Sequence, residues 1–295
     1  MTNNQAAPGT STHSLDGKRL PLVTFCVVTY RQSAEELTKA VSSLLLYKGE
    51  KVIYIVDNSP TGALSCIARL SPDVRYLRQT SNLGSCRGNN VGVREALKAG
   101  SAVHFVVNPD IYFGTDVVTP IVTYMLAHPE VGEMMPKILS PDGTVQHLPK
   151  LITSPAMQLQ RRSRRLCPKR FARWMWRFEM RGMRDDRVYE VGHVSGCFSA
   201  IRTDALRECG LFDERFFMYF EDNDLSRRIN SHYKTLYYPF VQVTHEYGHG
   251  ASKKLRLFCI FIVSMVKYFN KWGWLRDPVR TERNRAFLAQ TPWQH

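Results

Sequence analysis

Carboxylates border an aromatic run between Phe212 and Leu225, in the stretch FDERFFMYFEDNDL. Three of them, Glu221, Asp222 and Asp224, stand where this stretch is expected to pass from a loop into a helix. Carboxylates at a helix start interact favourably with its dipole, and one of Asp222 or Asp224 is expected to do only this. A carboxyl group beside aromatic rings is also suited to act as a general base, because its surroundings tune its pKa.

A candidate metal ligand follows the apolar run VHFVV, in the tripeptide Asn108-Pro109-Asp110. The proline restricts the residue before it to extended conformations, so Asp110 is expected to project at the edge of a sheet. One carboxylate and one amide are hard oxygen ligands of the kind that Mg²⁺ or Mn²⁺ prefers, with water and substrate phosphate completing the coordination.

Two further segments carry polar groups at the ends of expected elements. Asp57 ends the apolar run KVIYIVD and is followed by Asn58-Ser59-Pro60, for which a simple turn is an equal explanation. Residues 82–92, NLGSCRGNNVG, place three glycines and three asparagines ahead of an expected helix. Such a backbone suits close approach to a ligand, with amides facing anionic oxygen. The segment is not G-x-G-x-x-G, and no strand leads directly into it, so a dinucleotide fold is disfavoured.

The stretch HEYGHG at residues 245–250 matches the H-E-x-x-H pattern of zinc proteases. That chemistry needs both histidines on one helical face, with Glu246 beside a metal-bound water. Residues 240–244 alternate as a strand does, and Gly248 and Gly250 oppose a helix. A strand that ends at His245 and passes into a glycine-rich loop is therefore the favoured interpretation.

The elements that position these groups alternate regularly from Leu22. Apolar runs predict strands, and the segments between them predict helices, at residues 22–30, 34–46, 51–57, 62–70, 74–78, 88–99 and 102–108. Continuous apolar strands alternating with helices indicate an α/β fold with a mostly parallel sheet covered on both faces. Ligands bind beyond the carboxyl ends of such strands, where the polar groups fall.

After residue 110 the pattern changes. A helix is expected over residues 115–128 and a turn at 141–143, and residues 150–187 read as irregular and strongly basic. A strand over 194–202 and a helix over 222–230 follow.

The whole chain has 295 residues, 44% of them hydrophobic, and a formal net charge of +14. This composition is that of a globular protein, and the charge favours an anionic partner: a phosphate-bearing substrate, nucleic acid or an acidic membrane. Seven scattered cysteines without a C-x-x-C pair argue against a disulfide framework and for a reducing cytosol.

The two ends of the chain differ in character. Residues 1–19 contain no apolar segment and are expected to form a disordered polar tail rather than a signal peptide. Residues 251–295 are expected to be helical, and their apolar run LFCIFIVSMV is about half the roughly 20 residues that a membrane-spanning helix needs. Basic and aromatic residues flank this run, so a membrane interface and a helix packed on the sheet are both open.

Together and in this order, the motifs resemble the inverting family-2 glycosyltransferases of the GT-A fold, particularly bacterial rhamnosyltransferase-like members. The family's V-V-T-Y-N is matched by residues 27–31 with Arg31 in place of Asn, its V-D-N by residues 56–58, and its N-x-G-x-x-x-G-x-N-x-G by residues 82–92. Its metal motif corresponds to residues 108–110, and its G-G-F-D-E-x-F-F-M-Y-x-E-D-x-D-L to residues 210–225 with Leu211 for the second glycine. Each motif alone is weak, whereas five in register are specific.

The resemblance implies a single-domain, Rossmann-like GT-A unit over residues 20–250, with a nucleotide-binding half (20–110) and a catalytic, acceptor-binding half (111–250). It implies that Asp222 is the catalytic base, supported by Glu221, and that Asp110 and His245 hold Mg²⁺ or Mn²⁺. The residues it implies at the nucleotide-sugar donor are Thr29, Tyr30, Arg31, Asp57, Asn82, Gly84, Arg87, Asn90 and Asn108. Because Asn108 replaces a carboxylate, the protein alone is expected to bind the metal weakly.

The implied activity is metal-dependent, inverting transfer of a sugar, with dTDP-L-rhamnose as the favoured donor and a UDP-hexose as the alternative. The implied acceptor is a glycan or a polyprenyl-diphosphate-linked sugar, in polysaccharide or O-antigen-type biosynthesis of the cell envelope. The protein is then expected to be cytoplasmic and peripheral to the inner face of the membrane. A nucleic-acid-binding protein is the alternative from another class, since arginines and tryptophans interleave over 161–184, but it leaves the carboxylates without a role.

Overall fold

The computed structural model describes residues 14–15, 18–160, 168–246 and 255–291. The first half alternates as the sequence predicts, through β3 (Val23–Thr29), α1 (Ala34–Leu44), β4 (Lys51–Asp57), the 3₁₀ helix η1 (Ala63–Arg69), β5 (Val74–Arg78), α2 (Gly84–Lys98) and β6 (Val103–Val107). These strands are parallel and lie in the order β5-β4-β3-β6. The chain thus leaves β3 toward β4 and later returns to its other side. Such a reversal opens a crevice at the carboxyl ends of the strands.

The second half extends the same sheet through β7 (Ile111–Tyr112), α3 (Val118–Ala127), β8 (Val131–Leu139), β9 (Tyr189–Glu190), β10 (Phe198–Arg202), α6 (Thr203–Cys209), α7 (Glu221–Ile229) and β11 (Lys234–His245). Strand β10 is antiparallel to β6 and β8, whereas β8 and β11 are parallel. The described residues form a nine-stranded sheet, and the predicted mostly parallel α/β architecture is confirmed.

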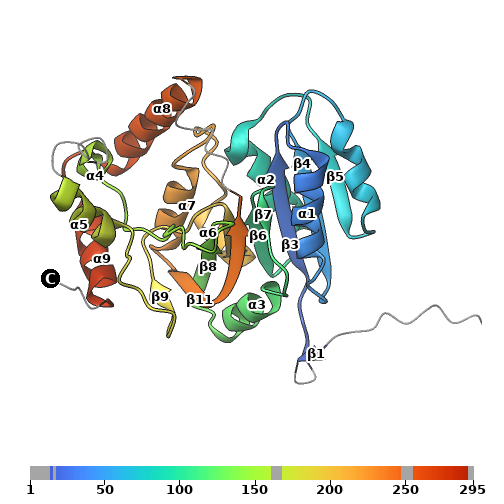
Figure 1. The fold of residues 1–295 in the computed structure, drawn as a ribbon, viewed down its shortest axis with the longest axis horizontal. Coiled ribbons are helices and arrows are strands. Elements are labelled where there is room, and N and C mark those ends of the chain that lie inside the picture. The colour runs from blue at the N-terminus through green and yellow to red at the C-terminus, as the bar shows by residue number, and fades with distance from the viewer. Residues whose placement is uncertain (1–13, 16–17, 161–167, 247–254, 292–295) are drawn as a thin grey trace, which may run out of the picture.

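Both faces of the sheet are covered (Figure 1). Alternate residues of β3 such as Phe25 belong to a core cluster with α1 and α3, and a second cluster gathers side chains of α2, α6, α7 and α8. Cys26 faces α2, where a Cβ on Gly92 would lie 2.4 Å from its sulfur. Burial of both faces is the reason that these strands read as continuous apolar runs.

The prediction of irregular structure over residues 150–187 is wrong for two segments, α4 (Pro155–Gln160) and α5 (Pro168–Phe178). The aromatic residues of α5 recur at helical spacing: Trp174 stacks on Phe178 at 5.4 Å and contacts Phe171 at 5.9 Å. Side chains three and four positions apart share one helical face, and the many arginines between them hide this period. α2 also begins four residues before its predicted start, so the glycine motif lies inside the helix.

The C-terminal segment forms α8 (Leu255–Trp272) and α9 (Pro278–Ala289), which lie with α4 and α5 at one end of the molecule (Figure 1). Tyr268 and Phe269 of α8 are buried in the second core cluster. Asn284 of α9 bonds the backbone N–H and carbonyl of Ile152 at 2.8 and 2.9 Å. The C-terminal segment therefore packs on the fold from Tyr268 onward, which is one of the two alternatives for it.

Two further findings concern membrane-spanning segments and the N-terminal residues. Within the described chain, every helix is too short or too polar to span a membrane. Where the sequence predicts a disordered tail, β1 (Ser14–Leu15) pairs with β2 (Lys18–Arg19) in a two-residue antiparallel ribbon.

Candidate active site

The crevice at the carboxyl ends of β3 and β6 gathers the predicted metal ligands. Strand β11 ends beside the turn that follows β6, because His245 pairs with Ile111. His245 Nε2 lies 3.3 Å from Asp110 Oδ1 and 3.4 Å from Asn108 Nδ2. Asp110 Oδ1 is buried, with no hydrogen-bond partner in the described chain. A buried carboxylate oxygen facing an imidazole nitrogen fits a divalent cation.

The protein contributes few ligands to this candidate metal site. No group of three or more His, Cys, Asp or Glu side chains with metal-binding geometry occurs among the described residues. Asp110 and His245 would therefore leave most of the coordination to diphosphate and water, as the replacement of a carboxylate by Asn108 predicts.

Gln146, which no motif singled out, orients His245. Its Nε2 donates to the His245 carbonyl at 2.9 Å, and its Oε1 lies 3.0 Å from His245 Nδ1. An amide oxygen can only accept, so the proton is assigned to Nδ1 and the Nε2 lone pair faces Asp110. Such a contact across 99 positions leaves no local signal in the sequence.

The neighbouring Glu246 binds other groups of the protein rather than a metal-bound water. It pairs with Lys39 at 2.5 Å, and its N–H donates to the Asp110 carbonyl at 2.9 Å. His245 ends a strand, as predicted, rather than lying on a helix, and His249 lies outside the described residues. The protease pattern is therefore not formed at His245.

A strained turn directly precedes the helix that carries the predicted base. Tyr219 and Phe220 have φ values of 71° and 65°, a left-handed conformation that side chains rarely adopt. α7 begins directly after them at Glu221. Burial, and then the charge of Asp222, raises the pKa of Glu221 to about 7. Ser85 Oγ donates to Glu221 Oε1, a contact that sequence reasoning missed.

The two oxygens of Asp222 have different surroundings. Oδ1 accepts from the backbone and side-chain N–H groups of Asn223 at 2.8 and 3.0 Å. Oδ2 lies 3.4 Å from the Gly196 amide and 3.7 Å from His193 Nε2. The Asp222 side chain is 24% exposed, so its carboxylate can be reached from outside.

Residues 196–197 connect this base to the candidate metal site. The Gly196 amide contacts Asp222, and the next carbonyl, that of Cys197, accepts from the Asn108 amide at 2.8 Å. Burial, with the charges of Asp110 and Asp222 adding to it, raises the pKa of Cys197 to about 12. The structure thus brings residues 110, 222 and 245 to one edge of the sheet.

Asp224, in contrast, is structural. It is fully buried, and it accepts from Arg228 at 2.9 Å, from Lys271 at 2.6 Å and from the Trp272 indole at 2.8 Å. It therefore ties α7 to α8, which matches the expectation that one of the two aspartates has no chemical role.

The predicted donor-binding residues at β3 and β4 lie at the same edge. Asp57 is fully buried, and its carboxylate accepts from the Ser59 amide at 2.8 Å and from the Tyr76 hydroxyl at 2.5 Å. Thr29 is buried, and its hydroxyl has no partner in the described chain. Tyr30 is 45% exposed, and the Arg31 guanidinium lies 5.3 Å from its ring.

The segment 82–92 is largely committed to internal contacts. Asn82 Oδ1 accepts from the Gly84 amide at 2.9 Å. Asn90 bonds the backbone of Phe212 in both directions, at 2.9 and 3.0 Å. Arg87 is exposed and faces Glu214 at 3.6 Å. Direct donor contacts by these residues stay predictions.

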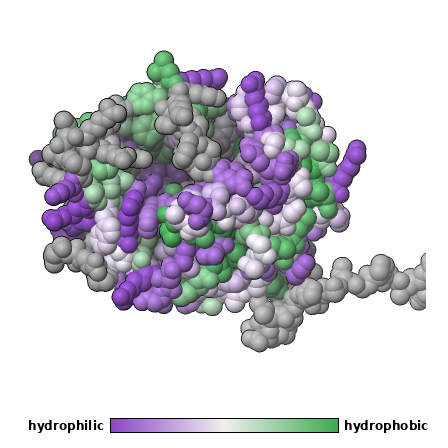
Figure 2. Space-filling view, viewed as in Figure 1, coloured by the Kyte–Doolittle hydropathy of each residue, from purple (hydrophilic) through white to green (hydrophobic). Residues whose placement is uncertain are grey.

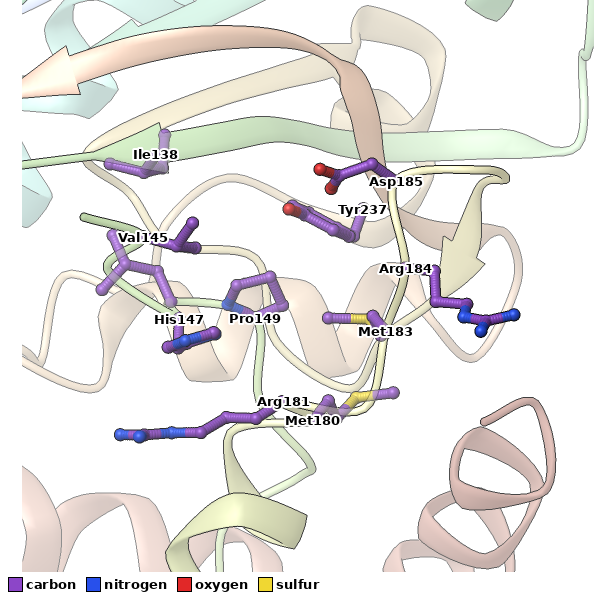
Figure 3. A pocket seen from close by; sticks show the side chains of 11 residues that line it. Ile138, Val145, His147, Pro149, Met180, Arg181, Met183, Arg184, Asp185 and Tyr237 are labelled. Carbon is purple, nitrogen blue, oxygen red and sulfur yellow. The ribbon is translucent and has the colours of Figure 1, made fainter. Parts of the chain in front are cut away.

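A cavity of about 210 Å³ lies behind the segment that carries Gln146. Figure 3 shows His147 and Pro149 on one side of it and Met183 on the other, with Arg181 and Arg184 at its margins. None of the predicted site residues lines this cavity, so it is distinct from the edge at which Asp110, Asp222 and His245 meet.

The chain is similar in sequence to a family model and to a protein of known activity. A family model described as glycosyltransferase like family 2 matches residues 21–257. An N-acetylglucosaminyl-diphospho-decaprenol L-rhamnosyltransferase of Mycobacterium tuberculosis is 29% identical over 250 residues, which are 79% of this chain and 78% of that protein.

Solved structures share the fold at low identity. The mannosyltransferase PcManGT of Pyrobaculum calidifontis, in complex with GDP-Man and Mn²⁺, matches with a TM-score of 0.59 and 14% identity over 95% of this chain and 73% of its own. GalNAc-T7 with UDP, GalNAc and Mn²⁺ matches at 0.57 and 16% over 78% of this chain. S. aureus TarS matches at 0.58 and 13% over 91% of this chain.

This chain spans only 44% of the GalNAc-T7 chain and 43% of the TarS chain, so those likenesses concern one part of larger proteins. The family model, however, covers most of the present chain, since it matches residues 21–257. The chain therefore belongs to glycosyltransferase-like family 2, and it is a glycosyltransferase with the GT-A fold.

Proposed function

We propose that the protein transfers a hexose, with inversion, from a nucleoside diphosphate sugar to a hydroxyl of a glycan or lipid-linked acceptor, with dTDP-L-rhamnose as the favoured donor. The observation that carries this proposal is the meeting of Asp222, whose side chain is partly exposed, with the Asp110–His245 pair at one edge. The rhamnosyltransferase relative supports the choice of sugar and of a polyprenyl-diphosphate acceptor. A UDP-hexose is the alternative donor.

Asp222 acts as the base in a single displacement. The bonds of Asn223 hold Oδ1, so Oδ2 takes the proton of the acceptor hydroxyl. The hydroxyl oxygen bonds to the anomeric carbon while the bond from that carbon to the diphosphate oxygen breaks, and the diphosphate leaves with the electron pair. A general base contributes roughly 10²- to 10⁴-fold in rate.

A divalent cation held by Asp110 and His245 would offset the charge that develops on the leaving diphosphate. Gln146 keeps His245 in the tautomer that can bind such a cation. On the donor side, Thr29, Tyr30 and Arg31 lie where the nucleoside is expected in an open α/β sheet.

The acceptor side includes a surface suited to an anionic membrane. The first half of α8 exposes Leu255 (79%), Phe258 (41%) and Val263 (52%), and it is among the apolar areas in the upper part of Figure 2. Exposed Arg256 and Lys267 border these side chains, and the chain as a whole carries a charge of +14. An apolar stripe with basic flanks favours peripheral attachment to anionic lipid, where a lipid-linked acceptor resides.

The test of the base is Asp222→Asn, with Asp204→Asn as the matched control on the exposed face of α6. Turnover should fall at least about 100-fold in the Asp222 variant, because the amide cannot accept the proton. Nucleotide binding with Mn²⁺ should be retained, and the Asp204 variant should match the wild type. Unchanged turnover in the Asp222 variant would remove that residue from the role.

The donor is identified by screening nucleotide sugars with Mn²⁺ or Mg²⁺, first by thermal shift and then by transfer to a polyprenyl-diphosphate-linked N-acetylglucosamine. dTDP-L-rhamnose is expected to give the largest shift and the product. Product from a UDP-hexose alone would reassign the donor, and the absence of product from every donor would overturn the proposed activity.

A further inference from the structure

His193 lies beside the proposed base in the segment between β9 and β10. Its side chain is only 6% exposed, and its Nε2 is 3.7 Å from Asp222 Oδ2. Its other ring nitrogen, Nδ1, is buried without a hydrogen-bond partner in the described chain. No sequence motif draws attention to this residue, and neither the metal pair nor the donor residues account for it.

The buried ring favours one tautomer. A buried N–H group without an acceptor is rarer in proteins than a buried acceptor without a donor. A proton on Nδ1 would create such an orphaned donor, whereas a proton on Nε2 points at the Asp222 carboxylate. The surroundings therefore assign the proton to Nε2.

Burial also keeps the ring neutral. It lowers the pKa of His193 to about 4, even though the nearby charge of Asp222 acts in the opposite direction. The titratable groups that face this pair from the packed elements are Lys150, Glu133, Cys197 and Glu221. At neutral pH the ring thus faces Asp222 with an N–H group at 3.7 Å rather than with a positive charge.

The backbone around His193 is fixed on both sides. His193 forms a bridge with Lys150, and the Gly192 amide donates to the Lys150 carbonyl at 3.0 Å. The next amide, that of Val194, donates to Ser226 Oγ of α7 at 3.1 Å. The ring is therefore anchored to the helix that carries the base, which preorganises the pair.

We propose that His193 is a positioning residue whose Nε2–H group, 3.7 Å from Asp222 Oδ2, closes to a hydrogen bond with that oxygen when the acceptor binds and so fixes its direction. The inference rests on the proposed function of Asp222. A catalytic group that is held in one direction by its neighbours loses less rate to misplacement.

The first test compares His193→Phe, which removes the donor and keeps a ring, with His193→Gln, which retains an N–H donor. The kcat should fall severalfold in the Phe variant and stay near the wild type in the Gln variant, because a misplaced base slows the chemical step. KM for the donor nucleotide should be unchanged in both. A kcat that is the same in all three proteins would overturn the proposal.

A second measurement needs no substitution at His193. With ¹⁵N-labelled histidine, the wild type at neutral pH should show the His193 ring neutral and protonated on Nε2, and Asp222→Asn should change its Nε2 resonance. A ring protonated on Nδ1, or a resonance indifferent to Asp222, would overturn the inference. This readout is independent of transfer, so a failure of the proposed activity to appear with any donor remains distinguishable from a failure of the His193 assignment.

Discussion

Glu221 and Asp222 are adjacent carboxyl groups that the fold treats differently. Glu221 is enclosed, and burial raises its pKa to about 7, so it is partly protonated at neutral pH. Asp222 receives two N–H groups from Asn223 on one oxygen, and its side chain is 24% exposed. Placing neighbouring carboxyls in unlike environments separates their protonation states, which is how one site obtains a base beside a neutral acid.

Gln146 should control metal affinity without touching the metal. In Gln146→Leu the His245 ring loses the acceptor for its Nδ1 proton, so its Nε2 is no longer directed at Asp110. Loss of such an outer partner typically weakens metal affinity by about 10- to 100-fold. Calorimetric titration of Mn²⁺ in the presence of a nucleoside diphosphate measures this change.

The conservative variant sharpens this experiment. Gln146→Glu keeps an oxygen that can accept from His245 Nδ1, so its Mn²⁺ affinity should stay closer to that of the wild type. Gln158→Leu, whose side chain bonds Thr153 away from the site, is the control. Equal affinities in the Leu and Glu variants of residue 146 would contradict the orienting role.

At the scale of elements, the glycines of α2 show what the sequence could and could not reveal. The motif at residues 82–92 is predicted to face a ligand, but a Cβ on Gly88 would lie 2.7 Å from Val28 and one on Gly92 would lie 2.4 Å from Cys26. These glycines therefore let α2 pack closely on β3. A pattern of glycines records that something approaches the backbone, and not whether it is a ligand or a neighbouring strand.

Strand β8 carries a buried carboxyl group that should make stability depend on pH. Burial raises the pKa of Glu133 to about 8, from 4.5 in water. Between these values the folded protein holds a proton that the unfolded chain has released, so the free energy of unfolding falls as pH rises, by about 1.4 kcal/mol per pH unit. Glu133→Gln, which can still accept from Ser199, should remove this slope.

Urea unfolding at about pH 5 and pH 8 measures the difference. The wild type should lose more stability over this interval than the Gln variant does. Glu95→Gln, at a surface pair with Lys98, serves as the control and should follow the wild type. Parallel slopes for the wild type and Glu133→Gln would show that Glu133 is ionised in the folded protein.

The strands and the crevice follow from the sequence, because apolar periodicity is a local signal, whereas a shared site for Asp110, Asp222 and His245 was implied only by the family resemblance. Gln146 and His193 could not be predicted, since their neighbours depend on strand register and on the bridge between residues 150 and 193. The helical period of α5 was obscured in the sequence by the arginines that lie between its aromatic residues. Local patterns thus predict elements and their polar ends, whereas the groups that orient a site depend on tertiary packing.

At the scale of the whole molecule, the exposed stripe of α8 should determine membrane attachment. The protein should float with vesicles containing anionic lipid, and less with neutral ones, because basic side chains border the stripe. Phe258→Glu should reduce flotation severalfold, since it places a charge in the apolar face. Salt should weaken the binding of the wild type.

The matched control is Leu126→Glu on α3, which lies at the lower edge of the molecule in Figure 1, whereas α8 lies at the upper left. Leu126 is 45% exposed, similar to Phe258 at 41%. The control should float as the wild type does. Equal loss in both variants would assign the attachment to general surface charge, and no flotation of the wild type would argue for a water-soluble acceptor.

The left-handed turn at Tyr219 and Phe220 is held by the ring of Phe220, which packs against Phe261, Tyr268 and Phe269 of α8. A helix that the ribosome releases late thus clamps the turn preceding the catalytic helix. Until residues 255–272 have been synthesised, the ring of Phe220 lacks all three of these contacts. A chain truncated before α8 should therefore hold the turn, and Asp222 after it, less firmly and turn over more slowly.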